Sequence, residues 1–236
     1  MISKTANHRS FGESPKPQIN PIFLPGDEKA SSIVCCIDIV VVLSLSGRTF
    51  QSQASQSLSF YEIPELNGIE VVSISGINNH CIAVTKKGEV FVYGRNYNGR
   101  LGLGKGKMGV AKFTEVSSLR SRKIKTAYGG YYHSLFQTVE GKILACGGNA
   151  SRELFLSQQK SDGDYFEPIE TKIENASFCI AGFNSSIIFK NFEPEMCPNK
   201  RIDIEKMRKN QNRTFSQKTK HQKQKDLCNY IVYICL

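Results

Sequence analysis

The chain has 236 residues, of which 40% are hydrophobic and 22% charged, and this allows one sizeable core with polar flanks. Its net charge of +10 is concentrated between residues 200 and 225, which hold ten Lys or Arg against two acidic residues. The N-terminus has no apolar segment, and the longest apolar run, residues 33–45, contains Asp38, so a signal peptide and a membrane span are excluded. We therefore expect a soluble, intracellular protein of the cytoplasm or the nucleus.

The eight cysteines and four histidines do not form a metal-binding pattern. No Cys-x-x-Cys pair occurs, and the histidines are scattered along the chain. A structural zinc site needs four clustered ligands, usually in close pairs. We therefore predict free thiols in a reducing compartment and no metal site.

Residues 1–30 are polar and contain Pro15, Pro17, Pro21 and Pro25. Proline removes a backbone donor and blocks helix formation. This segment therefore predicts an extended N-terminal arm, in which residues 22–24 form either one short strand or an anchor.

Residues 31–190 show a recurring hairpin pattern. Residues 34–45 are rich in β-branched side chains and predict one buried strand, followed by a turn at 46–47 and a second strand from Arg48. Gly88 lies where a short hairpin loop requires a positive φ angle. Further predicted strands are residues 81–85 and 89–93, 134–138 and 142–146, and a partial copy at 181–189.

A 28-residue stretch of this region recurs after a shift of 53 residues with eight identities, where roughly two are expected by chance. A period near 50 residues is typical of a multi-stranded blade of a β-propeller. The sequence therefore predicts an all-β fold of antiparallel four-stranded sheets. The recurring residues are Gly76, His80, Thr85, Gly88, Gly94, Asn96, Leu101 and Leu103 in the first copy, and Gly129, His133, Thr138, Gly141, Gly147, Asn149, Leu154 and Leu156 in the second.

Residues 191–236 predict a basic tail that is disordered or forms a solvated helix. Its charge suits nucleic acid, chromatin, another acidic partner or a nuclear import signal, and it equally suits a solvating tail without a partner. The apolar end, residues 227–236, is expected either to form an edge strand or simply to associate nonspecifically with other apolar surfaces. The candidate residues for binding an anionic partner are Lys200, Arg201, Lys206, Arg208, Lys209, Arg213, Lys218, Lys220, Lys223 and Lys225.

Residues 80–106, HCIAVTKKGEVFVYGRNYNGRLGLGKG, closely resemble the repeat of the regulator of chromosome condensation family. The family pattern is His, an apolar strand, a turn Gly, a second strand, Gly-x-Asn and a Gly-x-Leu-Gly-x-Gly ending. The second copy has Arg152, Phe155 and Ser157 where the family has Gly, which predicts a reshaped loop. The first copy has every element: His80, Gly88, Val90, Gly94, Asn96, Gly99, Leu101, Gly102 and Gly104.

This resemblance implies a seven-bladed β-propeller, which needs about 350 residues at the period seen here. Recognisable repeats cover about residues 31–190, which corresponds to about three repeats and leaves the blades incomplete relative to seven. The chain is then a divergent short member, a truncated product, or a part that closes the propeller by self-association. Open blades expose edge strands and favour pairing.

The recurring polar residues are interpreted as structural. His80 and His133 recur at one repeat position with no fixed carboxylate or Cys beside them, so we expect a ring nitrogen bonded to backbone within or between blades. Asn96 and Asn149 are expected to bond the turn backbone. The run from Gly99 to Gly106 lacks the spacing of a phosphate-binding loop, and its glycines are expected to let the connection pass close to a neighbouring blade.

No catalytic residue, metal site or cofactor is predicted. The first hypothesis for function is a non-enzymatic scaffold that binds another protein through its loops. The second hypothesis comes from the resemblance, because the founding family member is a guanine-nucleotide exchange factor that docks on chromatin, so a small GTPase is the implied partner. The third is association with chromatin or nucleic acid through the basic tail. No membrane partner is expected.

Overall fold

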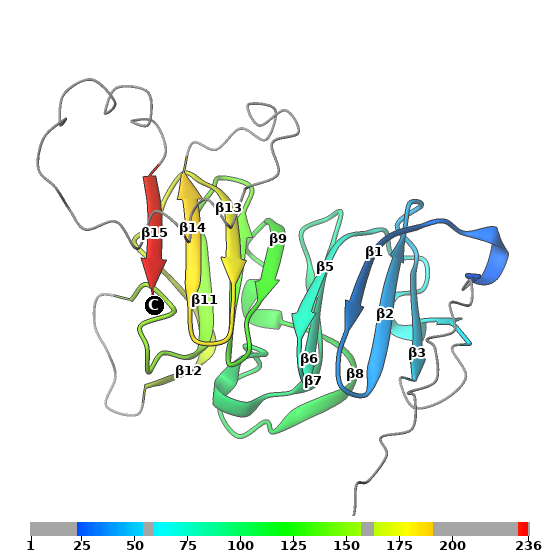
Figure 1. Cartoon of the computed structure of the whole chain (residues 1–236), viewed down its shortest axis with the longest axis horizontal. Helices are drawn as coiled ribbons and strands as arrows, with labels where there is room; N and C mark the ends of the chain where they lie inside the picture. The colour runs from blue at the N-terminus through cyan, green and yellow to red at the C-terminus, as the bar shows by residue number, and fades with distance from the viewer. Residues whose placement is uncertain (1–22, 54–58, 157–162, 191–230, 236) are drawn as a thin grey trace, which may run out of the picture.

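The computed structural model describes residues 23–53, 59–156, 163–190 and 231–235, which form four antiparallel sheets side by side in a curved row (Figure 1). The predicted all-β fold is confirmed, since the helical segments of this part of the chain are short 3-10 turns.

The first sheet contains β1 (Ala30–Cys35), β2 (Ile39–Ser44), β3 (Thr49–Gln53) and β4 (Tyr61–Glu62). The second contains β5 (Val71–Ile77), β6 (His80–Thr85), β7 (Val90–Arg95) and β8 (Gly109–Glu115). The third contains β9 (Ile124–Gly129), β10 (His133–Thr138), β11 (Ile143–Gly148) and β12 (Asp164–Glu170). The fourth contains β13 (Ala176–Ala181), β14 (Ser186–Lys190) and β15 (Ile231–Cys235).

The hairpin turns lie where the sequence predicts them. Gly47, Gly88 and Gly141 have φ angles of 85°, 85° and 79°, a region that glycine adopts without steric cost. At each turn the glycine N–H donates to the carbonyl at the end of the preceding strand, for example from Gly88 to Thr85 at 2.9 Å. Local turn chemistry therefore sets the hairpins.

The prediction of one buried strand over residues 34–45 is wrong. The segment makes two antiparallel strands, β1 and β2, with Val34 opposite Val41 and a turn at residues 36–38. Asp38 is exposed in this turn, because a charged carboxylate is costly within a buried strand. The continuous apolar run thus serves β2, which is buried on both faces, and part of the edge strand β1.

Three apolar cores lie between neighbouring sheets. In β6, Cys81 and Ala83 belong to the core shared with the first sheet, whereas Ile82 and Val84 belong to the core shared with the third. This follows from the alternation of side chains along a strand. A third core joins the third and fourth sheets through residues that include Leu135, Ile143, Ala145, Cys179 and Ile188.

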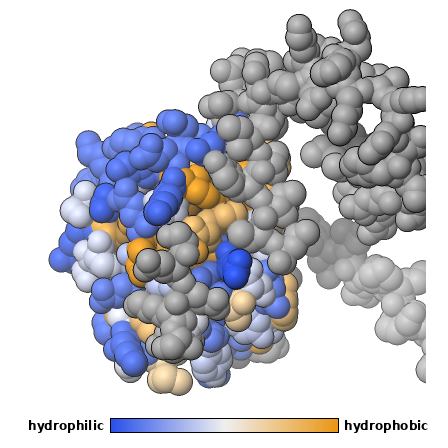
Figure 2. Space-filling view, turned by 90° about the vertical axis from the view of Figure 1, so that its left-hand side faces the viewer, coloured by the Kyte–Doolittle hydropathy of each residue, from blue (hydrophilic) through white to orange (hydrophobic). Residues whose placement is uncertain are grey.

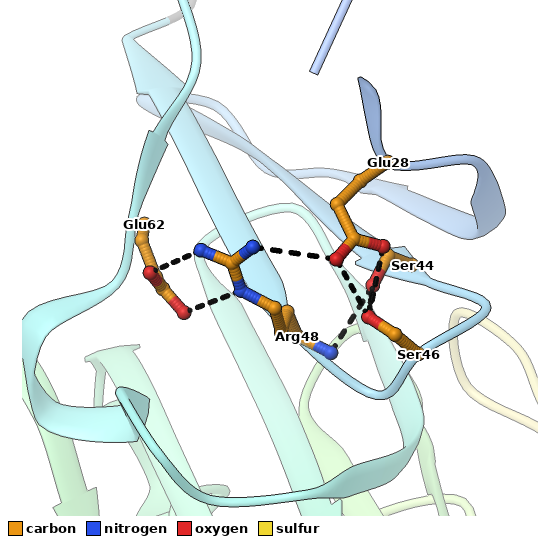
Figure 3. A network of polar contacts seen from close by, with 5 residues as sticks. All are labelled: Glu28, Ser44, Ser46, Arg48 and Glu62. Carbon is orange, nitrogen blue, oxygen red and sulfur yellow. Dashed lines mark hydrogen bonds and ion pairs between the residues drawn. The ribbon is translucent and has the colours of Figure 1, made fainter. Parts of the chain in front are cut away.

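The described part of the predicted N-terminal arm packs on the first sheet. Leu24 is buried with Phe50 and Phe60, so it acts as the anchor that the sequence left open. Glu28 is held by the Arg48 guanidinium at 3.3 Å, and Arg48 also makes a two-point contact with Glu62, at 3.0 and 2.7 Å (Figure 3). The hydrogen bond between Arg48 and Glu62 raises the pKa of Arg48 and lowers the pKa of Glu62. The pKa of Glu28 is lowered first by the hydrogen bond from the Ser46 hydroxyl and further by Arg48.

Two edges of the row differ in their connections. The loop edge, which lies at the bottom of Figure 1, is defined here as the loops after β1, β5, β9 and β13 together with residues 96–108 between β7 and β8. The turn edge, at the top, is defined as the tight turns after β2, β6 and β10 and the connections between sheets. The 3-10 turns η1 (Pro25–Asp27), η2 (Pro64–Leu66) and η4 (Ser117–Leu119) lie towards the turn edge, and η3 (Tyr97–Gly99) lies in the loop edge.

Residues 231–235 form the edge strand that the sequence left open for the apolar C-terminus. Strand β15 pairs antiparallel with β14, with Ile188 opposite Tyr233. The candidate basic residues between 200 and 225 lie outside the described residues, and their role stays a prediction.

Candidate functional site

The recurring histidines link neighbouring sheets. His80 Nε2 lies 3.2 Å from Ser134 Oγ in the third sheet, and His133 Nε2 lies 2.7 Å from Ser186 Oγ in the fourth. Ser134 Oγ also donates to the Arg100 carbonyl at 2.7 Å, so it accepts from a neutral His80 ring that carries its proton on Nε2. The Nε2 atom of each ring is thus bonded between sheets, and its partner there is a serine hydroxyl one sheet further on rather than a backbone group.

Both histidines are buried and held neutral. Burial lowers the pKa of His80 to about 3 and that of His133 to about 4, because a charged imidazole is disfavoured away from water. Neither ring is exposed, so neither can exchange a proton with a bound substrate. The two histidines therefore link neighbouring sheets through hydrogen bonds.

The two asparagines fold one turn in the same way. Asn96 Oδ1 accepts from the Leu101 N–H at 2.8 Å, and Asn149 Oδ1 accepts from the Leu154 N–H at 3.1 Å. Asn96 also donates to the Lys107 carbonyl at 2.9 Å. This is the backbone bonding expected of these amides.

The reshaped loop predicted for the second copy is wrong at the described positions. Arg152 and Phe155 adopt positive φ angles of 63° and 55°, close to those of Gly99 and Gly102, which are 82° and 68°. The turn bonds recur as well, with Arg152 N–H donating to the Asn149 carbonyl at 3.1 Å. The loop thus keeps its glycine-like backbone with side chains that disfavour it. Ser157 lies outside the described residues.

The other recurring residues serve close packing. A Cβ at Gly99 would lie 2.6 Å from Phe166 Cα, and a Cβ at Gly129 would lie 2.9 Å from Gly76 Cα in the second sheet, so these glycines allow connections and strands to touch. Gly102 approaches Pro168, while Gly104 has only an ordinary contact. The remaining close approaches are those of Gly94 to Asn79, Gly147 to Tyr132 and Gly141 to Asn175, and the fully buried leucines are Leu101 and Leu154.

Charge is distributed unevenly between the two edges. The six ion pairs found among the described residues, such as Lys86 with Glu70 and Arg122 with Glu170, all lie at the turn edge. At the turn edge, Leu45 and Val139 are exposed beside these ion pairs. The loop edge has none of the six ion pairs, and its described residues expose a larger set of apolar side chains. These are Ile37, Ile77, Tyr97, Met108 and Phe183, of which Met108 is 73% and Ile37 60% exposed.

A cleft opens at the loop edge between the first and second sheets. It has a volume of about 340 Å³, and its lining includes Asp38, Tyr93, Arg95 and Met108. A second hollow of about 240 Å³, lined by residues that include Tyr61, shares Tyr93 with it. The cleft is shallow and holds no convergent set of polar groups that suggests bond chemistry.

A second exposed apolar surface lies at the end of the row. On the outer face of the fourth sheet, Phe178 is paired across the strands with Phe189, and Ile180 with Ile187. Phe178 is 42% and Ile180 is 45% exposed. Figure 2 looks onto this end and shows apolar residues gathered between hydrophilic ones.

Sequence reasoning missed the serine partners of the histidines and several aromatic residues of the loop edge. Ser134 and Ser186 are offset by 52 residues, so the repeat itself would have marked the partners of the histidines. Tyr131 and Phe183 recur at the same offset, each after a glycine, whereas Tyr97 carries no repeat signal and only its position in the loop reveals it. Among the described residues, no group of three His, Cys, Asp or Glu side chains is arranged to hold a metal ion. The helical segments in this part of the chain are all too short to cross a bilayer.

Comparison with known proteins agrees with the repeat pattern and the fold. Residues 87–137 match the family description "Regulator of chromosome condensation (RCC1) repeat". The human X-linked retinitis pigmentosa GTPase regulator is 34% identical over 119 residues, which are 49% of this chain and 11% of that protein. The mouse secretion-regulating guanine nucleotide exchange factor is 36% identical over 84 residues, which are 36% of this chain and 18% of that protein.

The fold also matches a solved propeller. Prp20p from Saccharomyces cerevisiae superposes with a TM-score of 0.58 at 18% identity, covering 72% of this chain and 45% of that chain. The chain therefore spans less than half of this structural neighbour, and between 9% and 29% of curated relatives that it matches at 30% identity or more. Residues 87–137 thus carry an RCC1-type repeat, and the sheets of the described residues have the fold of β-propeller blades.

Proposed function

We propose that this chain is a non-enzymatic protein-interaction scaffold that binds a partner protein at its loop edge. The observation that carries the proposal is the contrast between the two edges: the described ion pairs lie at the turn edge, whereas the loop edge exposes Ile37, Tyr97, Met108 and Phe183. The cores of protein interfaces are poor in charged pairs and rich in aromatic and methionine side chains.

The relatives support a partner of the regulatory kind. One relative is a GTPase regulator and another is a guanine nucleotide exchange factor. The structure of Prp20p was described with its binding properties to Gsp1p and histones. A small GTPase or a chromatin protein is therefore the partner class to test first.

The test compares two surface variants of the full chain. Ile37→Ser with Met108→Ser removes exposed apolar groups of the loop edge, and Leu45→Ser with Val139→Ser removes matched groups of the turn edge, which are 71% and 55% exposed. Proteins retained from an extract of the source cells are quantified by mass spectrometry. We expect the first variant to lose proteins that the wild type and the second variant both retain. Equal retention by both variants would refute the proposal.

Guanine-nucleotide exchange on a small GTPase is the second candidate, and it draws on the similarity to the secretion-regulating exchange factor. Exchange factors bind the nucleotide-free GTPase and speed release of labelled nucleotide. A panel of GTPases loaded with fluorescent GDP tests this directly. Binding of a GTPase without faster release would leave the scaffold function and remove the exchange function.

The basic tail supports a third candidate, association with nucleic acid or chromatin. Residues 200–225 carry +8 of the +10 net charge, so deletion of this segment should abolish retention on immobilised DNA. Retention of the full chain should fall steeply with salt, because each neutralised phosphate releases condensed counterion. DNA retention that survives the deletion would contradict this role.

Self-association is the fourth point to test. The apolar pairs Phe178 with Phe189 and Ile180 with Ile187 form an outer sheet face that a second copy would cover. Sedimentation of the wild type and of Ile180→Asp distinguishes a monomer from an oligomer that depends on this face. A monomeric wild type would exclude it.

A further inference from the structure

We propose that the loop edge binds an acidic segment of a partner protein at an arginine–tyrosine cluster, defined as Arg95, Tyr97 and Arg100, beside an aromatic triplet, defined as Tyr131, Tyr132 and Phe183. This inference rests on the proposed scaffold function and names the chemistry of the segment that docks.

Two guanidinium groups lie against one ring in the cluster. The Cζ atoms of Arg95 and Arg100 are 5.8 and 5.4 Å from the ring centroid of Tyr97, and Arg95 Nη1 donates to the Tyr97 hydroxyl at 3.1 Å. Cations at this distance are attracted by an aromatic face. The ring thus holds two positive charges together at the exposed end of β7.

Two backbone carbonyls hold the guanidinium of Arg100. Its Nε donates to the Arg95 carbonyl at 2.8 Å, and its Nη1 donates to the Tyr131 carbonyl at 2.6 Å. Arg100 is 1% exposed, and its Nη2 has no hydrogen-bond partner among the described residues. Burial lowers the pKa of Arg100, yet a guanidinium remains charged.

The positive charge of the cluster is not neutralised within the described residues. None of the six ion pairs found there includes Arg95 or Arg100. The nearby carboxylate of Asp164 accepts instead from the Asn98 amide, with both oxygens 3.1 Å from its nitrogen. A buried charge without a counter-charge is unfavourable, so a carboxylate brought by a partner to Arg95 would also benefit from the field of Arg100.

The aromatic triplet provides an apolar surface next to this charge. The ring centroids of Tyr131 and Phe183 are 4.2 Å apart, and those of Tyr131 and Tyr132 are 4.6 Å apart. The Tyr131 N–H donates to the Gly182 carbonyl at 2.9 Å, which holds the loops of the third and fourth sheets together. Phe183 is 53% exposed. Rigid Tyr and Arg side chains of this kind dominate binding energy in interfaces.

Charge and geometry favour a protein segment over nucleic acid. The cluster exposes one arginine, Arg95, and Asp38 lines the same cleft as Arg95. A phosphate backbone requires a row of cations, whereas one carboxylate is satisfied by one charge-assisted contact. The matching ligand is an extended segment with an Asp or Glu next to an apolar residue.

The probe is a phage-displayed library of random 12-residue peptides, selected on the full chain. We expect the enriched peptides to share an Asp or Glu beside an apolar residue. The strongest peptide is then synthesised, and its binding is measured by fluorescence polarisation. Arg95→Gln should weaken binding at least tenfold, while Lys125→Gln, which removes an exposed charge from β9, should change it less than twofold.

A peptide in which the acidic residue is replaced by its amide should lose the same affinity and show no further loss with Arg95→Gln, because the two changes remove one interaction. Enrichment of peptides without acidic residues, no enrichment at all, or equal binding by Arg95→Gln would overturn the proposal. A fluorescent 20-nucleotide single-stranded DNA that loses affinity with Arg95→Gln would also overturn it. Each of these results leaves the proposed function standing if the Ile37→Ser, Met108→Ser variant still loses its retained proteins.

Discussion

His80 in the second sheet and Ser134 in the third sheet meet side chain to side chain, with Nε2 and Oγ 3.2 Å apart and both residues fully buried. The same contact recurs one sheet further on, between His133 and Ser186 at 2.7 Å. The third sheet therefore carries both the serine that meets the histidine of the second sheet and the histidine that meets the serine of the fourth. A hydrogen bond repeated in this way fixes the relative height of neighbouring sheets, which the apolar cores alone would leave free to slide.

Removal of the serine hydroxyl should destabilise the fold. In Ser134→Ala, the Nε2 atom of His80 loses its serine partner and the Arg100 carbonyl loses a donor, and an unsatisfied buried group costs about 1–3 kcal/mol. Urea denaturation measures the loss. The control Ser118→Ala changes an exposed serine and should leave the midpoint unchanged. Equal midpoints for the two variants would show that the link contributes nothing.

Stability should fall as the pH is lowered from 7 to 5. The pKa of His80 is lowered to about 3 and that of His133 to about 4, whereas both rise to about 6.5 in the unfolded chain. The unfolded state therefore binds more protons below pH 6.5, and stability that is complete above this pH is lost progressively down to the folded pKa values.

The expected loss between pH 7 and pH 5 is about 2 kcal/mol for each histidine. Urea denaturation at pH 5, 6 and 7 measures it. His133→Gln should reduce the pH dependence by about half, because one of the two buried imidazoles is gone. A wild-type stability that does not change over this range would contradict the burial of neutral rings.

Gly88 should tolerate a side chain less well than Gly68. Both have positive φ angles, 85° and 74°, but a Cβ at Gly88 would lie 3.0 Å from the backbone of Ile124 and Lys123, while a Cβ at Gly68 meets nothing within 4 Å. Gly68→Ala should cost about 1 kcal/mol from backbone strain alone. Gly88→Ala should cost more, up to about 3 kcal/mol. Thermal unfolding of the two variants distinguishes the cost of backbone strain from the cost of the close contact between sheets. Equal shifts in melting temperature would mean that the contact at Gly88 leaves room for a Cβ.

Arg152 offers a test in the opposite direction. Its φ angle of 63° lies in the left-handed region, which disfavours a residue with a Cβ by about 1–2 kcal/mol. Arg152→Gly should therefore be more stable than Arg152→Ala by about 1 kcal/mol, although glycine gains entropy in the unfolded chain. The pair of variants removes the same side chain, so chemical denaturation reports the backbone alone. A more stable Arg152→Ala would show that the turn is not strained.

The hairpins, the blade-like repeat and the turn glycines were accessible from the sequence because they depend on local chemistry. Side-chain alternation and a glycine at positive φ act over a few residues, so Gly88 and Gly141 mark their turns without knowledge of the fold. The asparagine turns are local in the same way, since Asn96 bonds the N–H of Leu101 five residues later. The four-stranded antiparallel sheets follow from these signals.

Other features depend on contacts between distant parts of the chain. The split of residues 34–45 into two strands requires a sheet in which β2 is central, and a continuous apolar run looks the same in one strand or two. The histidine partner lies 54 residues away, and the Arg100 contact with Tyr131 spans 31 residues. Such contacts form only when neighbouring sheets stack, because hydrophobic packing between sheets determines which loops meet. The proposed interaction surface therefore depends on the stacking of the sheets, whereas the strands of each blade follow from the repeat.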